Sequence, residues 1–233
     1  FLEIQKKLFK NEYIAYLLYG VTGSGKTEIY IQLVKRMIEQ KKSAVILVPE
    51  IALTPKLTWL FKNRLNHNIE IIHSGLSSGE RYDAWNRIIV NDFTIVIGAR
   101  SALFSPVKNL GLIIIDEEHE QTYKQSNTPP YYHARDAAVM LASIKKIPIV
   151  LGSATPSVES WYNAKNNKYI KLVLPERINK KPLPNVIIKE LSNKKNSLVN
   201  GFLSLELFHL IKNRIKSKEQ IILFLNRRGY API

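Results

Sequence analysis

Residues 20–27 read GVTGSGKT, and this stretch constrains the fold more than any other in the chain. It lies between a short apolar run, IAYLLY at 14–19, and a segment at 27–38 whose apolar residues have helical spacing. A strand, a glycine-rich loop and a helix start in that order match the P-loop pattern G-x-x-x-x-G-K-[ST]. Glycines let backbone N–H groups surround phosphate oxygens, and the helix N-terminus adds the positive end of its dipole. The stretch predicts a nucleoside triphosphate site, with an ordinary glycine-rich turn as the alternative.

The P-loop pattern gives roles to individual residues. Lys26 is expected to reach the outer phosphates, and the Thr27 hydroxyl is expected to hold Mg²⁺. The residues expected to contact the nucleotide are Gly20, Thr22, Gly23, Ser24, Gly25, Lys26, Thr27 and Glu28.

Apolar runs of strand length alternate with helix-like segments along most of the chain. We expect strands at 14–19, 44–48, 69–73, 94–98, 112–116 and 147–153, and helices at 27–38, 54–65, 78–90 and 133–144. The runs are apolar throughout, which is typical of a parallel sheet covered by helices on both faces. The sequence therefore predicts an α/β fold with ligands at the carboxyl ends of the strands.

The alternation stops after residue 175, where proline, lysine and asparagine become frequent. We predict a first domain at 1–175, a linker or edge segment at 176–202, and the start of a second α/β unit at 203–233. In this second α/β unit we expect a helix at 204–215 and a strand at 220–226. Because the chain opens without methionine and stops in a loop-like segment, we expect it to be a piece of a larger protein.

Charge and composition indicate which kinds of partner and which cellular location to expect for this protein. The net charge of +15 favours polyanions such as nucleic acid, although a general bias towards lysine, asparagine and isoleucine would give the same excess. The apolar runs are too short to span a membrane, and no signal peptide is visible. The absence of cysteine excludes disulfides and thiolate metal sites in this chain and suits a reducing cytoplasm, where we expect the protein to be located.

An acidic segment, DEEH at 116–119, directly follows an apolar strand. In a P-loop fold, Asp116 at that place is expected to hold the Mg²⁺ shell, and Glu117 is expected to polarise the attacking water. We predict Lys26, Asp116 and Glu117 as catalytic residues and Thr27 and Asp116 as metal ligands. A solvated acidic turn is the alternative.

The segment GSATPS at 152–157 follows another apolar strand. The hydroxyls of Ser153 and Thr155 could bond the carboxylates of DEEH and a phosphate, and so report the nucleotide state to a nucleic-acid site. Alternatively, Thr155 or Ser157 could simply cap a helix. Both interpretations can hold together.

Aromatic and basic residues alternate between 123 and 135. Aromatic faces stack on bases while cations hold phosphates, which suits a single strand of any sequence. The residues concerned are Tyr123, Lys124, Tyr131, Tyr132, His133 and Arg135. Alternatively, the tyrosines could pack against the sheet.

Further DNA contacts are expected at Arg100, Ser101 and the segment 49–54, through phosphates without base readout. A salt bridge at a helix start is the alternative for Arg100. His119 is interpreted as a coupling residue rather than a metal ligand.

The P-loop, DEEH and SAT segments resemble motifs I, II and III of superfamily 2 helicases. Further segments make the resemblance specific: LVPEIALTP, HSGLSSGERYDAW, VIGARSALFSP, YHARD and ILFLNRRGYAP. From about residue 13 onward, the chain resembles the bacterial primosomal replication-restart helicases, the PriA family.

This resemblance implies a RecA-like motor domain followed by the truncated start of a second one. It implies ATP and Mg²⁺ as cofactors, and hydrolysis that drives 3′→5′ movement on DNA during replication restart. Implied partners are single-stranded and forked DNA, primosome proteins and single-stranded DNA-binding protein. The zinc-binding cysteines and the arginine finger of the family have no counterpart among these 233 residues. The chain alone is therefore expected not to turn over ATP.

Other functions remain open at this point. A degenerate motor fold could serve only as a DNA-binding or primosome-assembly module, although the intact Lys26, Thr27, Asp116 and Glu117 oppose this. A translocase on RNA or on a duplex is a second alternative. A small-molecule P-loop kinase is a third, but it would explain neither GSATPS nor the charge.

Overall fold

The structure is a computed structural model that describes residues 4, 12–49, 55–180, 182, 184–188, 198–199 and 203–224. The chain divides into two compact units, Phe1–Pro182 and Leu183–Ile233. This division falls inside the segment 176–202 that the sequence marks as a linker. The predicted domain boundaries themselves stay a prediction.

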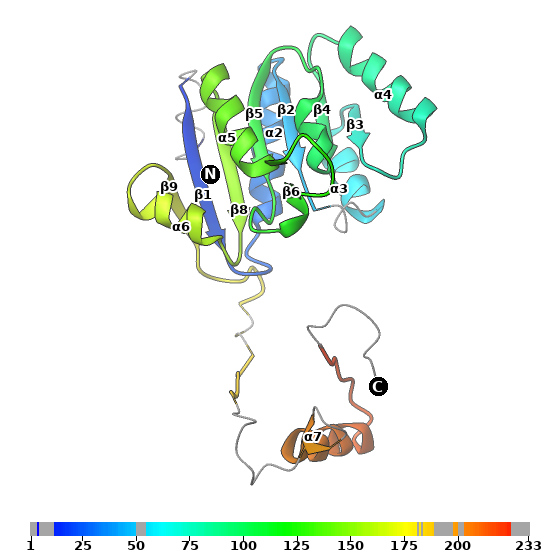
Figure 1. Ribbon diagram of the computed structural model, residues 1–233, viewed down its shortest axis with the longest axis vertical. Helices are drawn as coiled ribbons and strands as arrows, with labels where there is room; N and C mark the ends of the chain where they lie inside the picture. The colour runs from blue at the N-terminus through cyan, green and yellow to red at the C-terminus, as the bar shows by residue number, and fades with distance from the viewer. Residues whose placement is uncertain are drawn as a thin grey trace. The chain divides into compact units, whose positions relative to one another are not determined.

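A parallel sheet of seven strands forms the centre of the first unit (Figure 1). Its order is β3-β4-β2-β5-β8-β1-β9. The strands are β1 (Ile14–Gly20), β2 (Ser43–Leu47), β3 (Ile69–Ile72), β4 (Ile95–Gly98), β5 (Leu110–Ile115), β8 (Pro148–Ser153) and β9 (Ile170–Leu174). Since every pair is parallel, all carboxyl ends meet at one edge of the sheet.

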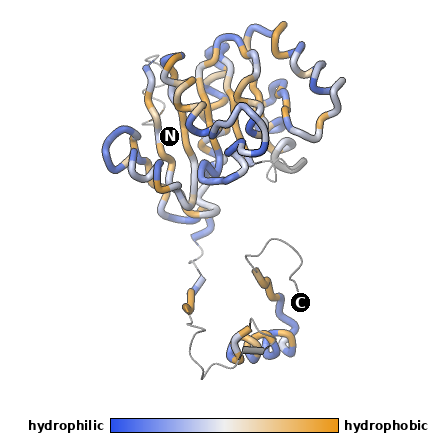
Figure 2. The backbone as a smooth tube through the Cα atoms, in the orientation of Figure 1, coloured by the Kyte–Doolittle hydropathy of each residue, from blue (hydrophilic) through white to orange (hydrophobic). Residues whose placement is uncertain are grey.

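Helices cover both faces of this sheet. They are α2 (Lys26–Glu39), α3 (Pro55–Leu65), α4 (Ser78–Val90), α5 (Ala134–Lys145) and α6 (Val158–Lys165). One buried cluster joins the sheet to α2 and α3, and a second joins its other face to α4, α5 and α6. Successive residues of a strand alternate between the two clusters, which is why the strands are hydrophobic along their length (Figure 2). The predicted α/β fold is confirmed.

Local sequence explains where several helices begin. The Ser77 hydroxyl accepts a hydrogen bond from the Glu80 N–H, and the Glu80 carboxylate accepts one from the Ser77 N–H, so α4 starts with a capping box. The Ser157 hydroxyl caps α6 by accepting from the Ser160 N–H. The predicted capping role of Ser157 is thus present.

Several short elements lie at the carboxyl edge of the sheet. The 3₁₀ turns η2 (Arg100–Phe104) and η3 (Gln121–Tyr123) follow β4 and β5. The two-residue strands β6 (Lys124–Gln125) and β7 (Tyr132–His133) pair antiparallel and close the loop between them.

Among the elements of the first unit that the sequence did not predict are the edge strand β9 and the helix α6. The edge strand β9 pairs with β1 alone and alternates between exposed and half-buried side chains, unlike the other strands. Helix α6 is only eight residues long, so its periodicity is weak.

The second unit contains a two-stranded antiparallel pair, β10 (Leu198–Val199) with β11 (Leu203–Ser204), and the helix α7 (Leu205–Lys216). The strand expected at 220–226 is wrong for the described residues 220–224, which have no regular structure. Ile222 and Phe224 are 95% and 87% exposed there. A strand needs neighbours that satisfy its N–H and C=O groups and cover its side chains. In the described ranges, no helix combines the length and apolar character that a membrane crossing requires.

Candidate functional site

The glycine loop connects β1 directly to α2. Gly23 and Gly25 have φ angles of +81° and +94°, a backbone region that residues with a Cβ rarely adopt. Gly25 caps α2 without a side-chain hydrogen bond, so the first N–H groups of the helix face the loop. At Gly20 a Cβ would lie 2.5 Å from the Ser24 hydroxyl, which explains a third glycine. The loop is therefore built for an anion at a helix N-terminus.

Lys26 is the buried charge of this loop. Its amino group donates to the Gly20 carbonyl at 3.0 Å and lies 3.7 Å from Glu117 Oε1. The Ser24 hydroxyl is buried, and it has no hydrogen-bond partner among the residues that the structure describes. An ammonium, an unsatisfied hydroxyl and helix N–H groups form a donor set that fits a polyphosphate.

A cavity of about 380 Å³ lies over the loop. It is lined by Thr22, Gly23, Ser24, Gly25, Lys26, Thr27, Glu28, Ile31, Leu60, Arg64, Asp116, Glu117 and Ile178. The predicted nucleotide, metal and catalytic residues thus gather in one place, apart from Gly20, which is the last residue of β1 and does not line the cavity.

Glu28 has a partner that the sequence did not indicate. Its carboxylate accepts two hydrogen bonds from the Arg64 guanidinium of α3, at 2.9 and 3.0 Å. It lines the cavity as half of an ion pair rather than as a free ligand. Ile178 also reaches the loop, since its N–H donates to the Gly23 carbonyl at 3.1 Å. No local pattern could have indicated Arg64 or Ile178, because both come from distant segments.

The acidic segment follows β5. Asp116 is held by two tyrosines, with Tyr30 donating to its carboxylate at 2.9 Å and Tyr123 donating to its main-chain carbonyl at 2.7 Å. Burial and the neighbouring Glu117 charge raise the pKa of Asp116, while the Tyr30 hydrogen bond and the Lys26 charge oppose that rise. Glu117 has a φ of +47°, which is a strained conformation for a residue with a Cβ.

His119 connects this segment to GSATPS. Its Nδ1 lies 2.8 Å from the Ser153 hydroxyl, and its Nε2 lies 3.2 Å from the Thr155 hydroxyl. Nδ1 also lies 3.7 Å from Glu117 Oε2. The two hydroxyls therefore meet the imidazole, rather than the carboxylates that the sequence suggested.

Glu118 is the centre of a buried cluster. Its carboxylate is fully buried and accepts hydrogen bonds from the Ser157 N–H and hydroxyl and from the Ser160 hydroxyl. It also pairs with Arg135 Nη1 at 3.3 Å. Burial lowers the pKa of the Arg135 guanidinium, but the nearby Asp136 and Glu118 carboxylates raise it by a larger amount. The net shift of the pKa is therefore upward. This cluster joins the acidic segment, the start of α6 and the start of α5.

Two expectations for the aromatic segment need correction. Tyr123 is 1% exposed and packs in the core, so its ring does not offer a face for stacking. Arg135 is 6% exposed and neutralises Glu118, so it is not a free cation for phosphate. Both side chains are buried, so neither is available to contact DNA directly. Tyr131 is 68% exposed, and Tyr132 is half-buried with its ring edge-on to Phe104.

Arg100 makes no salt bridge in the described part of the chain. Its guanidinium donates to the carbonyls of Lys124 and Thr122 at 2.9 and 3.4 Å and lies 6.0 Å from the Tyr132 ring centre. Arg100 thereby holds the aromatic loop. With Ser101 and Lys124 it lines a cavity of about 520 Å³ beside the carboxyl ends of β2, β3 and β4. Of the expected DNA path at 49–54, residues 50–54 lie outside the described residues.

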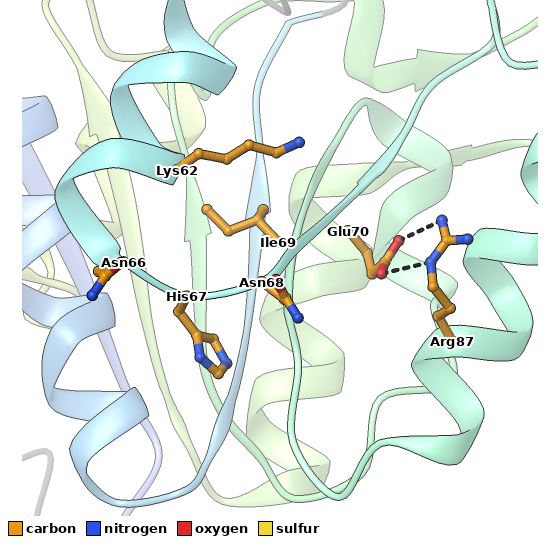
Figure 3. A pocket seen from close by; sticks show the side chains of 7 residues that line it. All are labelled: Lys62, Asn66, His67, Asn68, Ile69, Glu70 and Arg87. Atoms are coloured by element: carbon orange, nitrogen blue, oxygen red, sulfur yellow. Dashed lines mark hydrogen bonds and ion pairs between the residues drawn. The ribbon is translucent and has the colours of Figure 1, made fainter.

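A third cavity, of about 700 Å³, lies at the amino end of β3, on the opposite edge of the sheet (Figure 3). Its wall contains an ion pair in which the Arg87 guanidinium donates twice to the Glu70 carboxylate, at 2.9 and 3.0 Å. None of the predicted site residues lines it.

The chain is similar to known helicases over most of its length. Residues 3–163 match the DEAD/DEAH box helicase family. The chain is 44% identical over 228 residues to the replication restart protein PriA of Bacillus subtilis, covering 98% of this chain and 28% of that protein. It is 44% identical over 233 residues to PriA of Haemophilus influenzae, covering all of this chain and 31% of that protein. The chain thus spans less than a third of these relatives.

Solved structures support the fold. RecG bound to a three-way DNA junction superposes with a TM-score of 0.54 at 20% identity, covering 75% of this chain and 22% of that one. The Hef helicase domain of Pyrococcus furiosus superposes with a TM-score of 0.50 at 17% identity. This match covers 76% of this chain and 38% of that one. The first unit therefore has the RecA-like helicase fold, and the chain belongs to the DEAD/DEAH box helicase family.

Proposed function

We propose that the first unit is the nucleotide-hydrolysing motor domain of a DNA helicase that acts in replication restart. The observation that carries this is the meeting of Lys26 and Glu117, 3.7 Å apart, in the cavity that Thr27 and Asp116 also line. The family match and the PriA relatives support the same function.

In this proposal the chain's residues divide the work of ATP hydrolysis. Lys26 exchanges its bond to the Gly20 carbonyl for the outer phosphates. Thr27 and Asp116 hold Mg²⁺, which neutralises phosphate charge when bound. Glu117, adjacent to Lys26, orients the attacking water. A buried and partly neutralised site strengthens each of these electrostatic contacts.

The link to DNA runs through the two clusters beside the site. His119 joins Glu117 to Ser153 and Thr155, and Glu118 joins the acidic segment to Arg135. We propose that single-stranded or forked DNA contacts Tyr131, Lys124, Arg100 and Ser101, with Tyr132 supporting the loop. Tyr123 and Arg135 act through coupling and not through direct contact.

We also propose a direction of movement, a location and partners for the protein, on the basis of its PriA relatives and of its sequence resemblance to that family. The proposed properties are 3′→5′ movement, a cytoplasmic location, and work with primosome proteins and single-stranded DNA-binding protein. Zinc belongs to the proposal only for the complete protein, since these 233 residues contain no cysteine.

The test uses the protein expressed from its complete gene. Wild type should hydrolyse ATP faster with single-stranded DNA and unwind a duplex with a 3′ tail, but not one with a 5′ tail. Glu117→Gln should retain ATP and DNA binding and lose hydrolysis. Glu39→Gln, the same charge change at the exposed far end of α2, should behave as wild type. A wild type that binds DNA but never hydrolyses ATP would instead indicate an assembly module.

A further inference from the structure

Tyr30 lies on α2, one turn after Lys26, and is 1% exposed. Its hydroxyl donates to Asp116 Oδ1 at 2.9 Å, across 86 residues of sequence. The bond joins the helix that carries the phosphate-binding lysine to the carboxylate after β5. Rotation of that carboxylate away from Tyr30 would leave the hydroxyl of a buried tyrosine without its acceptor, and an unsatisfied buried donor costs free energy.

A second observation on a different strand points to the same hydroxyl. If Gly152 of β8 had a Cβ, that atom would lie 1.7 Å from the Tyr30 hydroxyl oxygen and 2.9 Å from Cζ. The φ of Gly152 is not in the left-handed region, so backbone conformation does not require glycine here. The space for the hydroxyl does require it. The glycine that opens GSATPS is therefore explained by Tyr30.

Hydrophobic burial alone does not account for this arrangement. Phenylalanine would fill the same cluster without a polar atom to satisfy. The hydroxyl is also the part of Tyr30 that Gly152 must accommodate. Both features favour a role for the hydroxyl bond itself.

We propose that Tyr30 is a positioning residue that orients the Asp116 carboxylate for Mg²⁺, and that Gly152 is present to admit its hydroxyl. This inference rests on the proposed function, in which Asp116 is a metal ligand. Partners that orient a metal ligand typically contribute about 10–100-fold to metal affinity or activity. Tyr30 itself touches neither nucleotide nor metal in this proposal.

The experiment compares Tyr30→Phe with Tyr16→Phe, another fully buried tyrosine of the same cluster, in the protein expressed from its complete gene. Three quantities are measured: the Mg²⁺ concentration for half-maximal ATPase, kcat and KM for ATP, and the affinity for a fluorescent ADP analogue in Mg²⁺ and in EDTA. Tyr30→Phe should need about 10–100-fold more Mg²⁺. Its affinity in EDTA and its melting temperature should match those of Tyr16→Phe.

A reciprocal variant tests the role of Gly152. Gly152→Ala should raise the Mg²⁺ requirement in wild type, because its methyl group displaces the Tyr30 hydroxyl. The same change should have a smaller effect in the Tyr30→Phe background, since the two residues are in contact.

Equal Mg²⁺ requirements for Tyr30→Phe and Tyr16→Phe would overturn the inference. So would an equal loss of nucleotide affinity in Mg²⁺ and in EDTA, because the damage would then lie in the P-loop fold. A wild type without ATPase activity would refute the proposed function instead. The binding measurements would still decide the role of Tyr30.

Discussion

The hydroxyl of Tyr123 donates a 2.7 Å hydrogen bond to the main-chain carbonyl of Asp116. A tyrosine from the aromatic segment thus supports the acid that follows β5, while Tyr131 of the same segment is exposed. Two tyrosines eight positions apart therefore have opposite environments.

Because of this difference, we expect replacement of Tyr123 to affect stability and replacement of Tyr131 to affect the response to DNA. Tyr123→Ala should lower the free energy of unfolding by about 3–5 kcal/mol, as expected for a large core side chain. Tyr131→Ala should leave stability unchanged and weaken DNA stimulation of ATPase, since stacking contributes about 1–3 kcal/mol per base. Urea denaturation measures the free energy of unfolding, and ATPase titrations with single-stranded DNA measure the DNA stimulation. Normal DNA stimulation in Tyr131→Ala would exclude stacking at that ring.

Lys26→Ala should reduce ATP hydrolysis about a hundredfold or more, because a preorganised charge is removed from the phosphate site. DNA binding without nucleotide should persist. Lys35→Ala, an exposed lysine on the same helix, serves as the matched control. Steady-state ATPase assays and DNA-binding titrations check this, and wild-type turnover in Lys26→Ala would refute the assignment.

Arg135→Met should destabilise the fold by about 3–5 kcal/mol, because it leaves the Glu118 charge buried without a cation. Adding Glu118→Gln should recover part of the loss. Arg87→Met removes a comparable but exposed pair with Glu70 and should cost much less. Chemical denaturation of these variants tests the prediction, and similar losses for Arg135→Met and Arg87→Met would contradict it.

His133 predicts a pH dependence. Its ring accepts a hydrogen bond from the Arg135 N–H at the start of α5, so it must be neutral. Burial and the Arg135 charge lower its pKa, against the opposing charges of Asp136, Glu118 and Glu159. The unfolded chain therefore takes up this proton at a higher pH than the folded chain does.

The His133 contribution to stability should thus be complete above about pH 6.5, the ordinary pKa of histidine, and decline as the pH falls below it. His133→Asn keeps a capping side chain that does not titrate. Between pH 7.5 and 5.5, wild type should lose more melting temperature than His133→Asn. Equal losses would show that other groups govern the change.

The 233-residue chain by itself should bind Mg²⁺-nucleotide weakly and turn over almost none. Motors of this type use an arginine finger worth about 10³–10⁵ in rate, and in these motors it comes from a second domain. Loose, salt-sensitive binding to single-stranded DNA should remain, as its charge of +15 suggests. Robust DNA-stimulated turnover, independent of protein concentration, would contradict this.

The sequence alone determined the features whose causes are local. The helix expected at 78–90 has those bounds in the structure, since its capping box and apolar spacing lie within the segment itself. Most of the expected strands were readable because they are apolar on both faces. The glycine loop was readable from its spacing between β1 and α2. The proximity of Lys26, Asp116 and Glu117 also followed, because parallel strands bring their carboxyl ends to one edge.

Only the tertiary structure decided which side chains point inward and with whom they pair. Tyr123 and Tyr131 belong to the same aromatic pattern, and only the packing of Tyr123 into the buried cluster of the sheet made one of them a core residue. Contacts such as Tyr30 with Asp116 join segments far apart, so no local window contains both partners. The strand expected at 220–226 is wrong for the described residues 220–224 for a related reason. A strand's hydrogen bonds and burial come from its neighbours, and neighbours are a property of the assembled sheet.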